Sequence, residues 1–207
     1  MFLGSPMWFL AGIPAILIAI AFHEFAHGKT AAILGDPTPR YQGRLTLNPI
    51  KHLDPIGTLM LVLAGFGWAK PVQVNPLYFK GDRQKGMMLV ALAGPTMNIV
   101  LAYFSAILIN LFAPAPGSFI YLFLYISKYI NVGLAVFNLI PLPPLDGSKI
   151  LTGLLPKRYL YNYYKIEAYA PLILLLLLVT GFLNIILEPG RDILLFLINT
   201  LASFTTF

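Results

Sequence analysis

The sequence predicts an all-α polytopic membrane protein, and three observations support this fold class. Of the 207 residues, 58% are hydrophobic and only 11% are charged, whereas charged residues make up roughly 25% of an ordinary soluble domain. The mean hydropathy is +0.78, and a soluble protein of this size could not bury so much apolar surface. Long charge-free runs alternate with short basic connections. Composition therefore excludes an ordinary soluble enzyme, a disordered tail and a fibrous repeat.

The net charge of +6 arises from 14 Lys and Arg against 8 Asp and Glu. In a soluble protein this balance would suggest a nucleic-acid partner. Here the charges lie in connections between apolar runs, where a bias toward positive cytoplasmic loops explains them. We therefore expect a lipid bilayer, and no nucleic acid, as a partner. Cysteine is absent, which excludes disulfides, thiolate metal sites and a cysteine nucleophile.

The first apolar run extends from about residue 7 to residue 34, which is long enough for a tilted spanning helix of about 20 residues or more. A cleaved signal peptide is the alternative interpretation. However, no Lys or Arg precedes the run, and it contains His and Glu, which a signal peptide would not carry. A second charge-free stretch, residues 86–127, is broken by Pro114, Pro116 and Gly117. It predicts helices over about 87–112 and 119–140.

Residues 58–68 are apolar but too short to span the membrane, and basic residues lie on both sides. This pattern predicts a segment that dips into the membrane and returns, as a hairpin or β element between the first two long helices. Residues 44–47 and 72–74 alternate as short strands do, and such strands must face protein or a wet cavity. A tilted short span is the alternative.

Two further segments complete the predicted five to six transmembrane helices. One helix is expected over about 168–187, and residues 193–207 span partly, lie in the interface or pack on the bundle. The chain thus reads as one domain over 1–207, with a core at about 7–155 and C-terminal helices at about 168–207. The basic connections place the N-terminus outside and these connections in the cytoplasm. Lys128 is an exception inside the 119–140 helix, and we expect it to face a polar cavity unless that helix begins later.

Three ionisable side chains fall within five residues of the first helix, in the order His23-Glu24-Phe25-Ala26-His27. Residues four apart share a helix face, so both imidazoles can bind one Zn²⁺. Glu24 can then reach a metal-bound water and take its proton. Two core histidines with a paired Glu are the alternative, but such residues are costly in an apolar helix and usually mark function.

A catalytic zinc site needs a third protein ligand, and Asp146 is the leading candidate. It follows the helix predicted at 119–140 through a proline-rich stretch, which makes extended backbone at membrane depth that is tolerated only beside a cavity. The predicted topology places Asp146 at a depth similar to that of His23 and His27. His52 is the competing ligand.

Two motifs together resemble the site-2 protease family of intramembrane zinc metalloproteases. The first is H-E-x-x-H, and the second is N-x-x-P-x-x-x-L-D-G, which is matched by Asn138, Pro141, Leu145, Asp146 and Gly147. Three further segments resemble the compact prokaryotic branch of this family: Asn48–Gly57, Gly67–Val72 and Ala93–Asn98. The resemblance covers about residues 15–155.

The resemblance implies that Asp146 is the third ligand of one Zn²⁺ per chain and that Glu24 is the general base. It also implies peptide-bond hydrolysis within or beside the bilayer of a prokaryotic cell membrane, with a transmembrane protein or peptide as substrate. We expect the site to lie near the cytoplasmic side. No PDZ domain or other appended domain is expected, and the oligomeric state is left open.

Several polar residues have two open interpretations. Asn138 either donates to the substrate carbonyl or oxyanion, or makes an interhelical hydrogen bond. His52 and Asn48 either line the entrance or support a ligand, or cap a loop. Asn98 is expected to be a helix-packing contact.

Two other functions are conceivable for the same scaffold. One is a non-proteolytic metal-binding membrane protein, against which the presence of Glu24 argues. The other is a metal or proton transporter, which would more naturally show duplicated halves.

Overall fold

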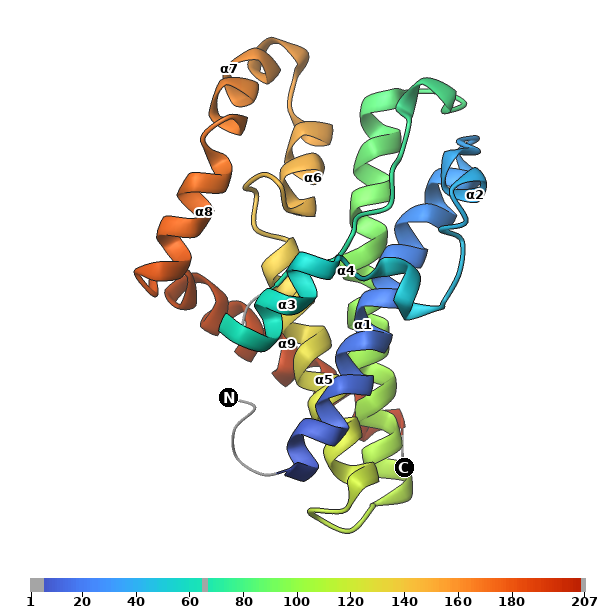
Figure 1. Cartoon of the computed structure of the whole chain (residues 1–207), viewed down its shortest axis with the longest axis vertical. Helices are drawn as coiled ribbons and strands as arrows, with labels where there is room; N and C mark the ends of the chain where they lie inside the picture. The colour runs from blue at the N-terminus through green and yellow to red at the C-terminus, as the bar shows by residue number, and fades with distance from the viewer. Residues whose placement is uncertain (1–5, 65–66, 206–207) are drawn as a thin grey trace.

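The computed structural model describes residues 6–64 and 67–205, and its regular structure is helical. Three helices form the central bundle: α1 (Pro6–Ile33), α4 (Arg83–Phe112) and α5 (Phe119–Asn138). α1 and α5 run in one direction and α4 runs in the other (Figure 1). Within the described residues these are the three helices that are long and apolar enough to cross a membrane. The predicted all-α membrane class is therefore confirmed.

Small residues allow α1 to approach its neighbours closely. Ala11, Ala15 and Ala19 follow one another at helical spacing and are fully buried. The first two share a hydrophobic cluster with Leu122 and Ile126 of α5. Lipid tails are as apolar as these side chains, so close van der Waals packing rather than exclusion from water favours this contact.

Polar side chains define where α4 and α5 begin. The Asp82 carboxylate accepts the backbone N–H of Lys85 at 2.9 Å, and the Ser118 hydroxyl accepts the N–H of Tyr121 at 3.2 Å. Both residues thereby satisfy N–H groups that have no partner within the first helical turn. The helices predicted over 87–112 and 119–140 are confirmed to within a few residues.

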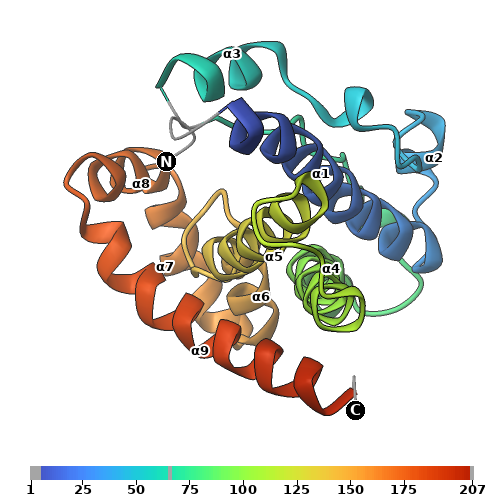
Figure 2. The same cartoon turned by 90° about the horizontal axis from the view of Figure 1, so that it is seen from below.

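The connection between α1 and α4, residues 34–82, contains four short helices: α2 (Thr38–Tyr41), η1 (Pro49–His52), α3 (Pro55–Ala64) and η2 (Pro76–Tyr78). α3 lies on the opposite side of α1 from α5 (Figure 2). Several apolar side chains of α3 do not pack against the bundle: Ile56, Leu59 and Leu63 are 65%, 55% and 72% exposed.

The two short strands expected in this connection are wrong. Neither 44–47 nor 72–74 is a strand, and in the described ranges the β-bridge is an isolated pair between Leu53 and Ala69. The physical reason is that side chains bind the backbone groups a ladder would use. His52 donates to the carbonyl of Thr46, and the N–H of Val72 donates to Glu24. α3 occupies the first part of the expected dip at 58–68, part of which (65–66) lies outside the described residues, and the membrane-dipping hairpin is not confirmed.

The C-terminal part consists of α6 (Asp146–Leu154), α7 (Lys157–Glu167), α8 (Ala170–Val179) and α9 (Phe182–Thr205). The helix expected over 168–187 is interrupted at Gly181, which has a left-handed φ of 73° that glycine adopts without steric cost. Of the segment expected at 193–207, residues 193–205 continue α9 instead of forming a separate element, and residues 206–207 lie outside the described residues.

The predicted five to six spanning helices are not confirmed. In the described part of the chain a fourth candidate span exists only if α7 and α8, bent by 59°, are taken as one broken span. α9 carries Glu188, Arg191 and Asp192, and it lies across α4 and α5, as the view nearly along those helices shows (Figure 2).

Buried contacts join α9 to the bundle. Leu195 and Ile198 share a hydrophobic cluster with Ala102 of α4 and Val132 of α5. Lys128 adds a polar contact, because its ammonium donates to Asn199 Oδ1 at 3.0 Å and lies over the rings of Tyr125 and Tyr129. The alternative that the helix begins after Lys128 is wrong, because α5 begins at Phe119, and the polar partner of Lys128 is Asn199 of α9.

Candidate metal centre

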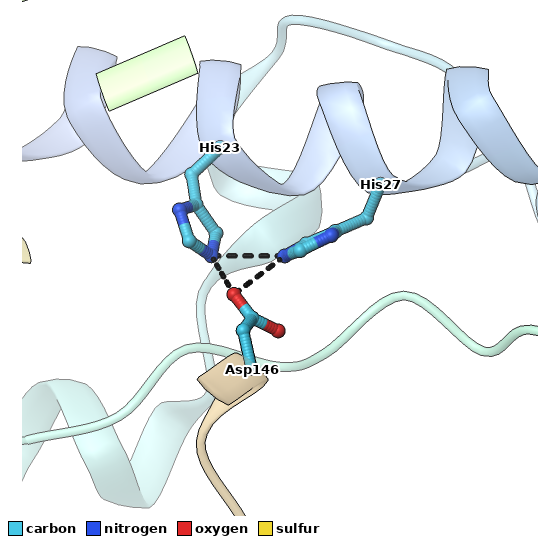
Figure 3. A group of neighbouring side chains, drawn as sticks. All are labelled: His23, His27 and Asp146. Atoms are coloured by element: carbon cyan, nitrogen blue, oxygen red, sulfur yellow. Dashed lines mark hydrogen bonds and ion pairs between the residues drawn. The ribbon is translucent and has the colours of Figure 1, made fainter. Parts of the chain in front are cut away.

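Three side chains from two distant parts of the sequence point toward one another (Figure 3). His23 and His27 extend from one face of α1, and Asp146 faces them from the first turn of α6. The two Nε2 atoms are 3.0 Å apart, and Asp146 Oδ2 lies 3.3 Å from Nε2 of His23 and 3.2 Å from Nε2 of His27. All three could offer one ligand atom to the same metal ion.

The turn after α5 brings Asp146 to this position. Residues 139–145 contain three prolines, which interrupt the helix, and Leu145 is the N-cap residue of α6. A Cβ at position 147 would lie 2.5 Å from the backbone carbon of Leu139. Gly147 therefore lets the start of α6 pack against the end of α5, which directs the preceding Asp146 toward α1.

The partners of the two Nδ1 atoms determine which ring nitrogens are free. Nδ1 of His23 lies 2.6 Å from Asn98 Oδ1, and Nδ1 of His27 lies 2.7 Å from the carbonyl oxygen of Val90. Both partners accept hydrogen bonds, so each neutral ring carries its proton on Nδ1. Both Nε2 atoms consequently present a lone pair to the same point.

These atoms fit a metal ion better than they fit one another. In the described part of the chain Asp146 Oδ2 is buried and has no hydrogen-bond partner. Two lone pairs and a carboxylate oxygen at 3.0–3.3 Å repel each other unless a cation or a proton lies between them. Tetrahedral ligands about 2.0–2.1 Å from zinc are themselves about 3.3 Å apart. The observed spacing matches that arrangement.

The surroundings of Asp146 keep its carboxyl ionised, which is the form that can bind a metal. Burial alone would raise the pKa of the Asp146 carboxyl, but the neighbouring His23 and His27 outweigh that effect and lower the pKa to about 2. The carboxyl is therefore ionised at neutral pH, and an ionised oxygen is the form that coordinates a metal.

Gly94 of α4 provides the space that the two histidines occupy. A Cβ at this position would lie 2.6 Å from Cε1 of His23 and 2.6 Å from Cε1 of His27. Real Cβ atoms do not come so close to other carbon atoms, so a larger side chain here would displace both rings. Gly94 thus shapes the site although it has no side chain.

Glu24 is buried next to His23, and one of its oxygens is held by the α1–α4 connection. Its Oε2 accepts the backbone N–H of Val72 at 2.9 Å. The same connection is tied to the end of α1 by Asp36, which accepts the N–H groups of Thr38 and Asn75. The bond to Val72 orients the Glu24 carboxylate.

Asn98 contributes more than the expected helix packing. It is fully buried and bonds His23, as well as the carbonyl of Ala19 and Asn131 of α5. The prediction that Asn98 joins helices is correct but incomplete, because it also contacts a candidate metal ligand.

The other predicted residues lie in different surroundings. Asn138 donates to Leu134 of its own helix at 3.0 Å. Asn48 caps η1 by accepting the N–H of Ile50. His52 is fully buried and contacts Thr46 in its own connection. Among the described residues, none of the three belongs to the His–His–Asp group.

Sequence reasoning did not assign Gly94, Asn131 or the Val72 N–H to the site. A usable signal existed for the first, since Gly94 and Asn98 are four residues apart in an apolar helix. That spacing places a small residue and a polar residue on one face of α4, matching the spacing of the two histidines. A backbone donor such as Val72 has no side-chain signal.

Comparison with known proteins places this site in context. Peptidase family M50 matches residues 113–180. YwhC of Bacillus subtilis, whose name gives zinc metalloprotease as its expected activity, is 40% identical over 197 residues, covering 90% of each chain. MJ0611 of Methanocaldococcus jannaschii, named in the same way, is 45% identical over 152 residues, 71% of this chain and 72% of its own.

A third relative, Rip2 of Mycolicibacterium smegmatis, also carries a name of this kind. It is 30% identical over 181 residues, which cover 85% of this chain and 69% of Rip2. No solved structure matches the chain significantly.

Proposed function

Because this chain belongs to peptidase family M50, the site-2 protease family, we propose that it cuts peptide bonds in or near the transmembrane segments of other membrane proteins. It is a zinc metalloprotease and an integral membrane protein. The proposal concerns where it acts, on what class of substrate, and which residues do the chemistry.

One observation carries the proposal. Two Nε2 lone pairs and the Asp146 carboxylate converge within 3.0–3.3 Å at bundle depth, and Glu24 adjoins the first of these ligands. We assign His23, His27 and Asp146 as the ligands of one Zn²⁺ and Glu24 as the general base. Ionisable groups are costly at such a depth, so a set with this order and spacing favours catalysis over packing.

Zinc, when bound, supplies Lewis acidity that polarises a peptide carbonyl and acidifies water. The protein residues do the rest of the work. Glu24 takes a proton from the attacking water at its carboxylate and returns it to the leaving amine. The N–H of Val72 holds Oε2 of Glu24, which fixes the direction in which the carboxylate faces. We also assign Asn138, at the end of α5, a donor role toward the substrate carbonyl.

The substrate must reach this site as extended chain. A transmembrane helix has its carbonyls bonded internally, so it must unwind before it is cut. The α1–α4 connection is the proposed entrance, because it contacts Glu24 directly and exposes the apolar side chains of α3 on the side of α1 away from α5.

The charge distribution supports an orientation. The α1–α4 connection is basic, and so are α6 and α7, which carry Lys149, Lys157, Arg158 and Lys165, whereas the turn at 113–118 between α4 and α5 carries no charge. The positive connections are therefore assigned to the cytoplasm and the N-terminus to the outside. In this arrangement the cluster lies toward the cytoplasmic side, from which water enters.

Glu24→Gln tests the mechanism in the purified full chain. The variant keeps the shape of the side chain but cannot take a proton, so we expect unchanged zinc content and cleavage of a single-span substrate in liposomes that is about 10²- to 10⁴-fold slower. Unchanged cleavage would overturn the assignment of Glu24.

Asp146→Ala is the companion variant for the metal. It removes a ligand, so zinc content measured by metal analysis should fall strongly together with cleavage. Full retention of zinc would remove Asp146 from the ligand set and leave His52 as the candidate.

A further inference from the structure

Asn98 lies where three membrane helices meet, and every polar atom of its side chain has a partner. Oδ1 faces Nδ1 of His23 at 2.6 Å, and Nδ2 donates to the carbonyl of Ala19 at 3.3 Å and to Asn131 Oδ1 at 2.7 Å. Asn98 and Asn131 are both fully buried. In such surroundings each donor must face an acceptor, since an unpaired buried polar group is strongly destabilising.

The Ser127 backbone carbonyl fixes which atom donates and which accepts in each of these hydrogen bonds. Nδ2 of Asn131 donates to the backbone carbonyl of Ser127 at 2.9 Å, and a carbonyl oxygen can only accept. Asn131 must therefore turn its Oδ1 toward Asn98, which in turn must offer its amide hydrogens to Asn131. The Oδ1 of Asn98 is thereby left facing His23, and it can only accept the proton on Nδ1.

We propose that Asn98, supported by Asn131, is the positioning residue that fixes His23 in its Nδ1-protonated form, so that its Nε2 lone pair faces the metal. This inference rests on the proposed ligand set. The chain of bonds runs from Ser127 through Asn131 and Asn98 to His23. It links α5, α4 and α1, so the orientation of one ligand depends on the packing of three helices.

The two histidines are supported in different ways. His27 donates to the backbone carbonyl of Val90, an acceptor present whatever side chain stands at that position. His23 depends on a side-chain amide, which presents an oxygen or an amino group according to its rotation. Of the two histidines, His23 is therefore the one whose protonated nitrogen depends on a side chain that mutation can change.

Zinc affinity of the full chain in detergent, measured by competition with a chelator of known affinity, tests this proposal. Asn98→Ala removes the acceptor, and loss of such a contact to a metal-binding histidine typically weakens metal binding about 10- to 100-fold. Asn98→Asp keeps an oxygen for the Nδ1 proton but loses the donors to Ala19 and Asn131. We expect it to restore zinc affinity to within about threefold of the native protein, because a carboxylate supports zinc-binding histidines well, while its thermal unfolding temperature falls.

Ser105→Ala is the matched control. Ser105 is another buried polar residue of α4. Its hydroxyl bonds the Leu101 carbonyl and the Ser127 hydroxyl, so its loss leaves in place the Ser127 backbone carbonyl to which Asn131 donates. Its replacement should lower thermal stability and leave zinc affinity unchanged. A role of Asn98 in packing alone predicts that Asn98→Asp loses zinc affinity as Asn98→Ala does, and that result would overturn the proposal.

Two further measurements keep the outcomes separate. If Asn98→Ala does not fold, the other two variants decide. Native-like zinc affinity in Asn98→Asp together with weakened affinity in Asn131→Ala supports the proposal. Weakened zinc affinity in Asn98→Asp overturns it. His23→Ala tests the ligand set on its own. Full zinc retention in His23→Ala contradicts the proposed function, whereas zinc loss there with native affinity in Asn98→Ala contradicts the inference alone.

Discussion

Two regions contact the His23–His27 segment of α1: the bundle contacts His23, and the α1–α4 connection contacts Glu24. The two regions are stabilised by different kinds of contact. On the bundle side, α4, α5 and α6 supply buried side chains that bond one another directly, such as Asn98 with Asn131 and His23. On the other side, the connection supplies a single backbone N–H from Val72. Its own structure depends on local bonds, such as that between His52 and Thr46.

This difference separates two tasks. Metal ligands need fixed positions, and buried hydrogen bonds between packed helices provide them. The proposed entrance for substrate needs to move, and a connection of short helices and irregular backbone opens at a lower free-energy cost than packed helices do. We therefore expect the rigid part to surround His23, His27 and Asp146 and the adaptable part to lie over Glu24.

The largest effect is expected from filling the space at Gly94. Gly94→Ala places a methyl group against both imidazoles, and overpacking of about 3 kcal/mol corresponds to roughly 100-fold weaker zinc binding. Zinc affinity and substrate cleavage should fall together. Gly133→Ala in α5 is the control, because a Cβ there meets nothing within 4 Å. Native zinc binding by Gly94→Ala would mean that the histidines are not confined by α4.

An intermediate effect is expected where the two regions touch. Val72→Pro removes the N–H that Glu24 accepts, and a hydrogen bond to a charged group contributes about 1.5–3 kcal/mol. We expect kcat to fall about 10- to 100-fold while zinc content stays native. Val72→Ala keeps the N–H and should remain close to native. If both variants lose activity equally, packing of the side chain, rather than the bond, explains the role of position 72.

The smallest effect is expected inside the connection. His52→Ala removes a buried donor to Thr46, which should lower thermal stability by about 1–3 kcal/mol and leave zinc content near native. Asn48→Ala removes an exposed cap and should cost roughly 1 kcal/mol. Loss of zinc in His52→Ala would move His52 into the ligand set and would remove the distinction between the two regions.

The same two regions differ in how far the sequence predicted them. The spacing of His23 and His27 and the position of Asp146 after a proline-rich stretch are properties of local sequence, so the cluster could be anticipated. Apolar runs likewise located α1, α4 and α5 within a few residues. Periodicity and polarity are sufficient where a helix is long and its exceptions are few.

Prediction failed where backbone groups found side-chain partners. Alternation at 72–74 suggested a strand, but the N–H of Val72 bonds Glu24, which lies far away in sequence. Gly181 broke a helix that hydrophobicity alone predicted as continuous, whereas Pro189 lies inside α9 without ending it. The bond of Val72 cannot be read from local pattern because its partner is distant in sequence, whereas Gly181 is a local signal that hydrophobicity alone does not register.

The order of the proposed ligands along the chain has a consequence for biosynthesis. His23 and His27 belong to α1, whereas Asp146 follows two further membrane helices. A ribosome therefore releases the histidine pair into the membrane well before the third ligand exists. The nascent chain cannot assemble a complete zinc site until α4 and α5 have been inserted and the turn after α5 has been made. We therefore expect peptidase activity only after Asp146 has been synthesised, and a truncated translation product that stops before this turn would be inert.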